Sequence, residues 1–138
     1  MGVGIQVGNI IDEIGTPDFL NAFFSTVSVH LEPGGWGSRF PLLLGDLYRG
    51  QLNAVNATQA VDELQLVRAE LSKLPPSAVV WDTDNRAAKP PWGDKISAEI
   101  TSLGNYFVSS TGRDLFDLLH EALAASAESA EPARIVQY

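Results

Sequence analysis

Apolar residues recur at helical spacing in several stretches of the chain, and the clearest of these follows Thr16-Pro17-Asp18. Threonine can cap a helix, proline suits the first helical position, and an acidic side chain complements the positive end of the helix dipole. The last residues of this stretch, Val27–Leu31, also alternate with period two and could instead be extended. We expect a helix that supplies the main face of the core, formed by Phe19, Leu20, Phe23, Phe24, Val27 and Leu31.

Three further helices are expected from the same pattern. The second spans Phe40–Tyr48, with a proline in its first turn and Gly50 at its end. The third begins at Asn56-Ala57-Thr58-Gln59, which has the form of a capping box, and Pro75-Pro76 stops it. The fourth follows Thr111–Asp114 and turns Leu115, Phe116, Leu118, Leu119, Ala122 and Leu123 inward. On the third helix, a solvated face is expected for Glu63, Arg68, Glu70 and Lys73.

Period-two alternation and short apolar runs predict a small sheet. Residues 2–14 read as one strand, or as two short strands joined near Gly8-Asn9. Further strands are expected at Ala78–Trp81, at Tyr106–Val108 and, as an edge strand, at Ile135–Tyr138. With 138 residues the chain is long enough for one core, so we expect a single domain over residues 1–138. The predicted fold class is α+β, with about four helices packed against one side of a small, mostly antiparallel sheet.

The composition of the chain narrows the classes of function that it can have. Cysteine is absent, which excludes disulfides, thiolate metal sites and thiol catalysis. The formal net charge of −8 disfavours direct nucleic-acid binding and would steer a basic protein partner, although the acids could equally serve only solubility. No basic stretch leads into an apolar run, and nowhere do about 18 apolar residues follow one another. We therefore expect neither export nor membrane contact, and a cytoplasmic location.

The polar side chains do not form a recognisable catalytic or metal-binding pattern. The two histidines, His30 and His120, have no partner positioned by the sequence, so a structural role is expected for each. Asp82-x-Asp84 resembles the start of a calcium loop, but Arg86 stands where an oxygen ligand is needed and no glycine follows it. We therefore expect no catalytic residue, no cofactor and no metal. These aspartates and Asp94 are instead acceptors for turn amides or an acidic patch offered to a partner.

Two loops combine tryptophan with glycine or proline: Gly34–Phe40, which contains Trp36 between glycines, and Pro90–Asp94, which contains Trp92. Glycine permits a sharp turn that holds a large ring in place. Each ring could be packing or interface, and tryptophan and arginine in rigid loops often dominate protein interfaces. We expect the two loops to frame one surface. The predicted partner-binding residues are Trp36, Arg39, Asp82, Asp84, Trp92 and Asp94.

Six motifs in order carry a resemblance that covers nearly the whole chain: Gly4-Ile5-x-Val7-Gly8-Asn9, Phe19–Thr26, Trp36–Pro41, Val79–Asp82, Pro90–Asp94 and Asn105–Phe116. With them the chain resembles the immunity protein 70 family of bacterial polymorphic-toxin systems. The resemblance implies a small, non-enzymatic cytoplasmic protein that is made beside a toxin and protects the producing cell by binding the toxin's C-terminal domain. The mechanism that fits is stoichiometric occlusion, and the acidic surface favours a basic toxin such as a nuclease.

Two other functions are compatible with the same residues. The loops could serve a regulatory or scaffold protein that binds a partner unrelated to toxins. A small hydrolase or isomerase could use Asp82, Asp84 or His120.

Overall fold

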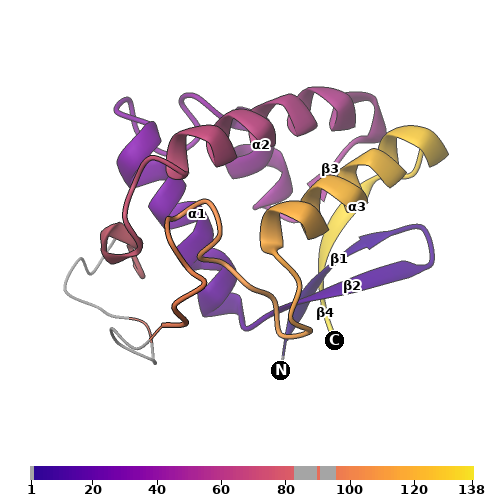
Figure 1. The fold of residues 1–138 in the computed structure, drawn as a ribbon. Helices are drawn as coiled ribbons and strands as arrows, with labels where there is room; N and C mark the ends of the chain where they lie inside the picture. The colour runs from indigo at the N-terminus through magenta and orange to yellow at the C-terminus, as the bar shows by residue number, and fades with distance from the viewer. Residues whose placement is uncertain (1, 83–89, 91–95) are drawn as a thin grey trace.

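Three α-helices and a shorter π-helix lie on one side of a four-stranded antiparallel sheet in the computed structural model, which describes residues 2–82, 90 and 96–138 (Figure 1). The predicted α+β class is confirmed. No helix in this described part is long and apolar enough to cross a bilayer. In chain order the elements are β1 (Val3–Val7), β2 (Ile10–Gly15), α1 (Pro17–Leu31), the π-helix η1 (Pro41–Leu47), β3 (Gln51–Leu52), the 3-10 turn η2 (Ala54–Asn56), α2 (Ala57–Leu71), the 3-10 turn η3 (Pro76–Ala78), α3 (Leu115–Ser129) and β4 (Ala133–Gln137).

The sheet has the order β2-β1-β4-β3. The two-strand alternative for the N-terminal stretch is confirmed, since β1 and β2 pair around Gly8, whose φ of 60° is easily reached by glycine. The strand predicted at Ile135–Tyr138 exists as β4, but its expected position at the edge is wrong. It lies between β1 and β3, and Ala133 pairs with Val7 on one side and with Leu52 on the other.

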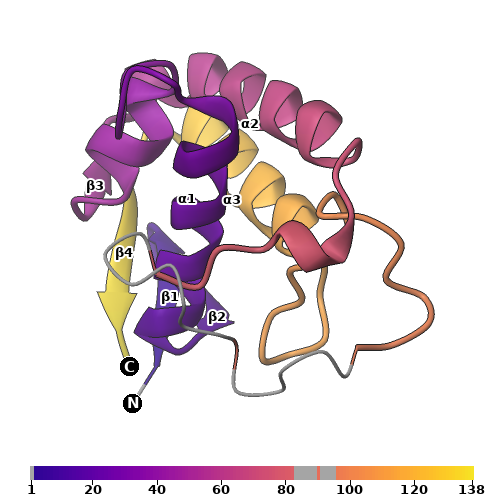
Figure 2. The same cartoon turned by 90° about the vertical axis from the view of Figure 1, so that its left-hand side faces the viewer.

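Two other predicted strands are wrong. Ala78–Trp81 begins in η3 and then runs along α1, where the backbone N–H of Val80 donates to the hydroxyl of Thr26 and its carbonyl accepts from that hydroxyl (3.0 and 3.1 Å; Figure 2). A helix side chain therefore satisfies the polar groups that a strand would have paired. Tyr106–Val108 makes one isolated bridge, from Val108 to Asp114.

The helices follow the prediction more closely than the strands do. The hydroxyl of Thr16 accepts from the amide of Phe19 (3.1 Å), and α1 stays helical to Leu31, so the extended alternative at its end is wrong. Asp114 caps α3. The capping box at Asn56 is not formed: this residue has helical backbone angles at the end of η2, and its side chain makes no capping hydrogen bond.

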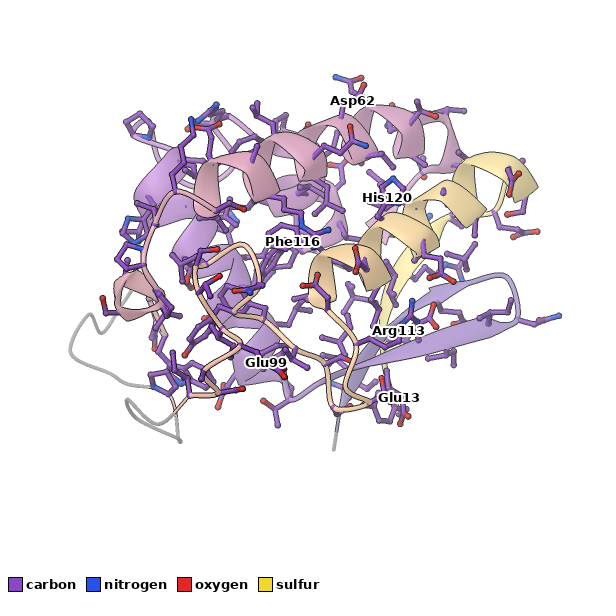
Figure 3. The ribbon with its side chains drawn as sticks, in the orientation of Figure 1. Glu13, Asp62, Glu99, Arg113, Phe116 and His120 are labelled. Atoms are coloured by element: carbon purple, nitrogen blue, oxygen red, sulfur yellow. The ribbon has the colours of Figure 1, made fainter. Side chains whose placement is uncertain are left out.

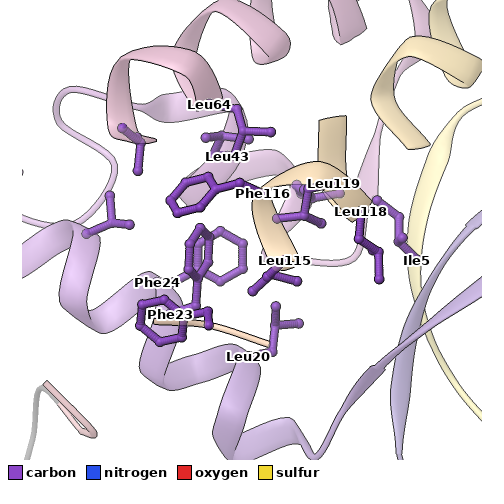
Figure 4. Close-up of a cluster of buried hydrophobic side chains, with 14 of the residues drawn as sticks. Ile5, Leu20, Phe23, Phe24, Leu43, Leu64, Leu115, Phe116, Leu118 and Leu119 are labelled. Atoms are coloured by element: carbon purple, nitrogen blue, oxygen red, sulfur yellow. The ribbon is translucent and has the colours of Figure 1, made fainter. Parts of the chain in front are cut away.

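The core lies between α1, α3 and the inner face of the sheet. Phe23 of α1 sits at its centre, with ring centroids 5.2 Å from Phe24, 5.2 Å from Phe107 and 5.3 Å from Phe116 (Figure 4). Edge-to-face contacts of this kind are favourable beyond the area that they bury. The loop that follows α1 therefore starts from a helix that is firmly packed in the core.

Candidate functional site

The glycine-rich turn after α1 is organised by Glu32, a carboxylate that is only 3% exposed. Its Oε1 accepts from the backbone N–H of Gly37 (3.0 Å), and its Oε2 accepts from those of Arg39 (3.1 Å) and Phe40 (2.9 Å). Gly35 and Gly37 have φ values of 105° and 79°, where side chains are strongly disfavoured. The turn is thus held in one conformation by three charge-assisted hydrogen bonds.

The indole ring of Trp36 is held by contacts on one side, and part of it remains exposed to solvent. Its indole Nε1 donates to the carbonyl of Leu44 (2.8 Å), and its ring lies 5.0 Å from that of Tyr48. Tyr48 in turn lies 5.2 Å from Phe24, and its hydroxyl accepts from Asn21 (2.8 Å). Trp36 and Tyr48 remain 38% and 37% exposed. They form a rigid, partly exposed aromatic pair.

Arg39 joins the turn to two helices. Its guanidinium makes two hydrogen bonds with the carboxylate of Glu70 on α2, the one from Nη1 being 2.9 Å, and Nη1 also donates to the carbonyl of Leu31 (3.2 Å). The same group lies 5.0 Å from the ring centre of Phe40. The hydrogen bond with Glu70 raises the pKa of Arg39 against the opposing effect of desolvation. Glu70, expected on a solvated face, is therefore part of the turn's support.

Of the other predicted partner-binding residues, the structure describes only Asp82. Trp36 is linked through Tyr48 to Asn21, whereas the segment that leads to Asp82 is bonded to Thr26. These two positions of α1 are five residues apart, or about 140° around the helix. Trp36 and the segment leading to Asp82 thus lie on different sides of α1. Asp84, Trp92 and Asp94 lie outside the described residues, so the surface framed by two loops stays a prediction.

Sequence reasoning missed the role of Glu63, which was expected on a solvated face. Its carboxylate is half-buried and accepts from the backbone N–H groups of Leu43 (3.1 Å) and Leu42 (3.4 Å) at the start of η1. Burial raises the pKa of Glu63, hydrogen bonds from these two amides oppose the shift, and the nearby charges of Glu32 and Asp46 add to it. The contact spans 20 residues, and no local spacing signals it.

Neither histidine is built into a catalytic arrangement by the described residues. His30 Nε2 lies 2.6 Å from the carbonyl of Ala78, which ties η3 to the end of α1. His120 is exposed on α3 (Figure 3), and with Arg68 and Phe116 it lines a groove of about 240 Å³. Across residues 2–82, 90 and 96–138, no group of three or more histidine, aspartate or glutamate side chains is placed to hold a metal ion.

A small helix-and-sheet domain that presents a preformed turn with an exposed aromatic pair has features typical of a protein-binding module. The family model described as Immunity protein 70 matches residues 5–135 of the chain. The chain belongs to this family, which confirms the resemblance found in the sequence and indicates a role in toxin immunity. No curated protein and no solved structure matches this chain.

Proposed function

We propose that this protein neutralises a bacterial polymorphic toxin by binding the C-terminal domain of its cognate toxin and occluding it, which protects the producing cell. The protein acts by stoichiometric binding in the cytoplasm and transforms no substrate. The observation that carries this proposal is the family match over residues 5–135, nearly the whole chain. The local structure of the turn supports a binding role.

The aromatic pair of Trp36 and Tyr48 has the properties of an interface anchor. Large aromatic side chains in well-packed sites supply much of the energy of protein association. Because Glu32 and the carbonyl of Leu44 already fix the turn and the indole, little conformational entropy remains to be lost on binding. The pair therefore favours tight binding by a rigid partner surface.

Charge supports the same partner class. The chain carries a formal net charge of −8, and a complementary basic surface on the toxin would raise the association rate. Rapid capture matters for a toxin that damages the cell producing it. A basic toxin domain, for example a nuclease, is therefore the partner we propose, bound without direct contact to nucleic acid.

Co-expression with the toxin domain encoded by the adjacent gene tests this proposal. The protein should restore growth and co-purify with the toxin as a complex of fixed stoichiometry, measured by size-exclusion chromatography with light scattering. An unrelated toxin domain of similar size and charge serves as the control and should be neither bound nor neutralised. Absence of both rescue and complex would refute the proposal, and consistent recovery of a partner unrelated to toxins would favour the scaffold function.

The same assay addresses the enzyme alternative. Asp82→Asn and His120→Ala should rescue growth as well as the parent protein does. Loss of rescue in a variant with an unchanged circular dichroism spectrum and an intact complex would favour a hydrolase over a binding protein.

A further inference from the structure

A groove on the outer side of α2 is a second candidate binding feature, separate from the aromatic pair of Trp36 and Tyr48. It measures about 490 Å³ and lies between the end of the glycine-rich turn and the helix. Arg39, Phe40 and Pro41 contribute one wall, and Asp62, Glu63 and Leu66 contribute the other. We call it the α2 groove. It is large enough for a long side chain with its neighbouring backbone.

The apolar part of the α2 groove is exposed. Leu66 is 44% exposed on the outer face of the helix, and Pro41 on the other wall is also exposed. Leu66 lies one helical turn after Asp62 and Glu63, so apolar and acidic groups lie together along one stripe of α2. The α2 groove therefore combines exposed apolar groups with acidic ones.

The acidic groups of the α2 groove lack a cationic partner among the described residues. Asp62 projects from the outer side of α2 (Figure 3), Glu63 lies next to it in the lining of the groove, and the charge of Asp46 is close enough to act on Glu63. Within the described ranges, none of the three forms a salt bridge. Arg39, the cation among the residues lining the α2 groove, is already bonded to Glu70. The α2 groove thus presents net negative charge and half-buried carboxylate oxygens.

These features match a long basic side chain. Lysine and arginine combine an apolar stem with a cationic head, so the stem would pack on Leu66 and Pro41 while the head bonds the carboxylates of Asp62 and Glu63. Burial of Glu63 disfavours its charged form, and an incoming cation would offset that cost. A neutral or acidic occupant would give neither carboxylate a cationic partner.

From this complementarity we infer that the α2 groove receives a lysine or arginine side chain of the toxin domain, as a second contact beside Trp36. The inference rests on the proposed function. Trp36 and Phe40 are four residues apart, so their Cα atoms are separated by at most about 14 Å. A standard protein interface of roughly 800 Å² per partner is wide enough to span that distance.

The test uses the full chain and the toxin domain encoded by the adjacent gene, with binding measured by surface plasmon resonance at low and moderate salt. Asp62 is exposed and has no side-chain hydrogen bond in the described part of the structure, so Asp62→Lys should fold normally. It should weaken binding by about 10-fold or more at low salt, with part of the loss in the association rate. Asp62→Asn should give a smaller loss, and Leu66→Ala should lose affinity about equally at both salt concentrations.

Glu128→Lys is the matched control, because it makes the same change in net charge at an exposed position near the end of α3. It should reduce affinity by less than about 3-fold. Equal losses for Asp62→Lys and Glu128→Lys, or an Asp62→Lys affinity within about 2-fold of wild type, would overturn the inference. If the wild-type protein itself neither binds nor neutralises the toxin, the proposed function fails as well.

Charge exchange identifies the occupant. Each lysine and arginine of the toxin is changed to glutamate in turn. One of these toxin variants should bind the wild-type protein weakly and should bind the Asp62→Lys protein more tightly. Absence of any such pair would refute a basic side chain in the α2 groove. Self-association of the wild-type protein that Asp62→Lys abolishes would assign the groove to a second copy instead.

Discussion

Replacement of Glu32 by alanine should destabilise the protein strongly, because this one side chain holds the turn between α1 and η1. The change removes three hydrogen bonds of 2.9–3.1 Å from backbone amides to a carboxylate. The amide of Phe40 is buried and loses its partner, which costs about 1–3 kcal/mol. The amides of Gly37 and Arg39 are nearer the surface and can take up water, so we assign each about 1 kcal/mol. The expected loss is about 3–5 kcal/mol.

Replacing Glu32 by glutamine separates the contribution of the side chain's shape from the contribution of its charge. Glu32→Gln keeps the volume, but its amide nitrogen is a donor and must face at least one backbone N–H of the turn. We expect a loss of about 1–2 kcal/mol, smaller than that of alanine. Glu128→Ala changes an exposed glutamate on α3 and should stay within about 0.5 kcal/mol of wild type.

Urea unfolding followed by circular dichroism measures these differences. With a slope of about 1–3 kcal/mol per molar urea, the alanine variant should lower the midpoint by at least about 1 M. A free energy of unfolding within about 1 kcal/mol of wild type at an unchanged slope would refute the reasoning. The turn would then be held by its glycines and by packing, and the carboxylate would be incidental.

Three further variants test other parts of the structure. Burial raises the pKa of Glu63, so the folded protein binds a proton there more readily than the unfolded chain does. The stability that this group contributes therefore falls as the pH rises from its ordinary pKa through the raised pKa. Glu63→Gln should remove that slope in urea unfolding series between about pH 4 and 7, and an unchanged slope would contradict the assignment. Phe23→Ala should cost about 3–5 kcal/mol in the same assay, against less than about 0.5 for Val55→Ala at an exposed position, and a loss under about 2 would contradict a central role for the ring. Trp36→Ala loses the bond to Leu44 and should cost about 1–2 kcal/mol while weakening toxin binding by about 10-fold or more; a melted circular dichroism spectrum would instead assign the ring to the core.

The helices could be predicted because their signals are local. Thr16 and the apolar spacing from Phe19 to Leu31 sit within one element, and the structure uses them as expected. Asn56 fails as a cap because the preceding turn η2 already gives it helical backbone angles. The strand at Ala78–Trp81 fails because a short apolar run does not specify its partner, which here is Thr26 of α1. The two-residue strand β3 is too short to carry a pattern.

The site could be predicted only in part, for a similar reason. Trp36 and Arg39 stand out by residue type within a glycine-rich turn, and the sequence alone singles them out. Glu32 and Glu63 act on amides that the fold brings to them, and a buried glutamate looks like any other in the sequence. Their roles depend on burial and distance, which a one-dimensional pattern does not contain.

The position of β4 between β1 and β3 has a consequence for how the protein is made. β1 leaves the ribosome well before the strand that flanks it opposite β2, because β4 is synthesised roughly 130 residues later, a wait of roughly 6–26 s at ordinary elongation rates. During that interval the early hairpin has an unsatisfied inner edge, and α1 and η1 have no complete sheet to cover. The sheet therefore closes late in synthesis, once β4 has been made and can pair with both β1 and β3.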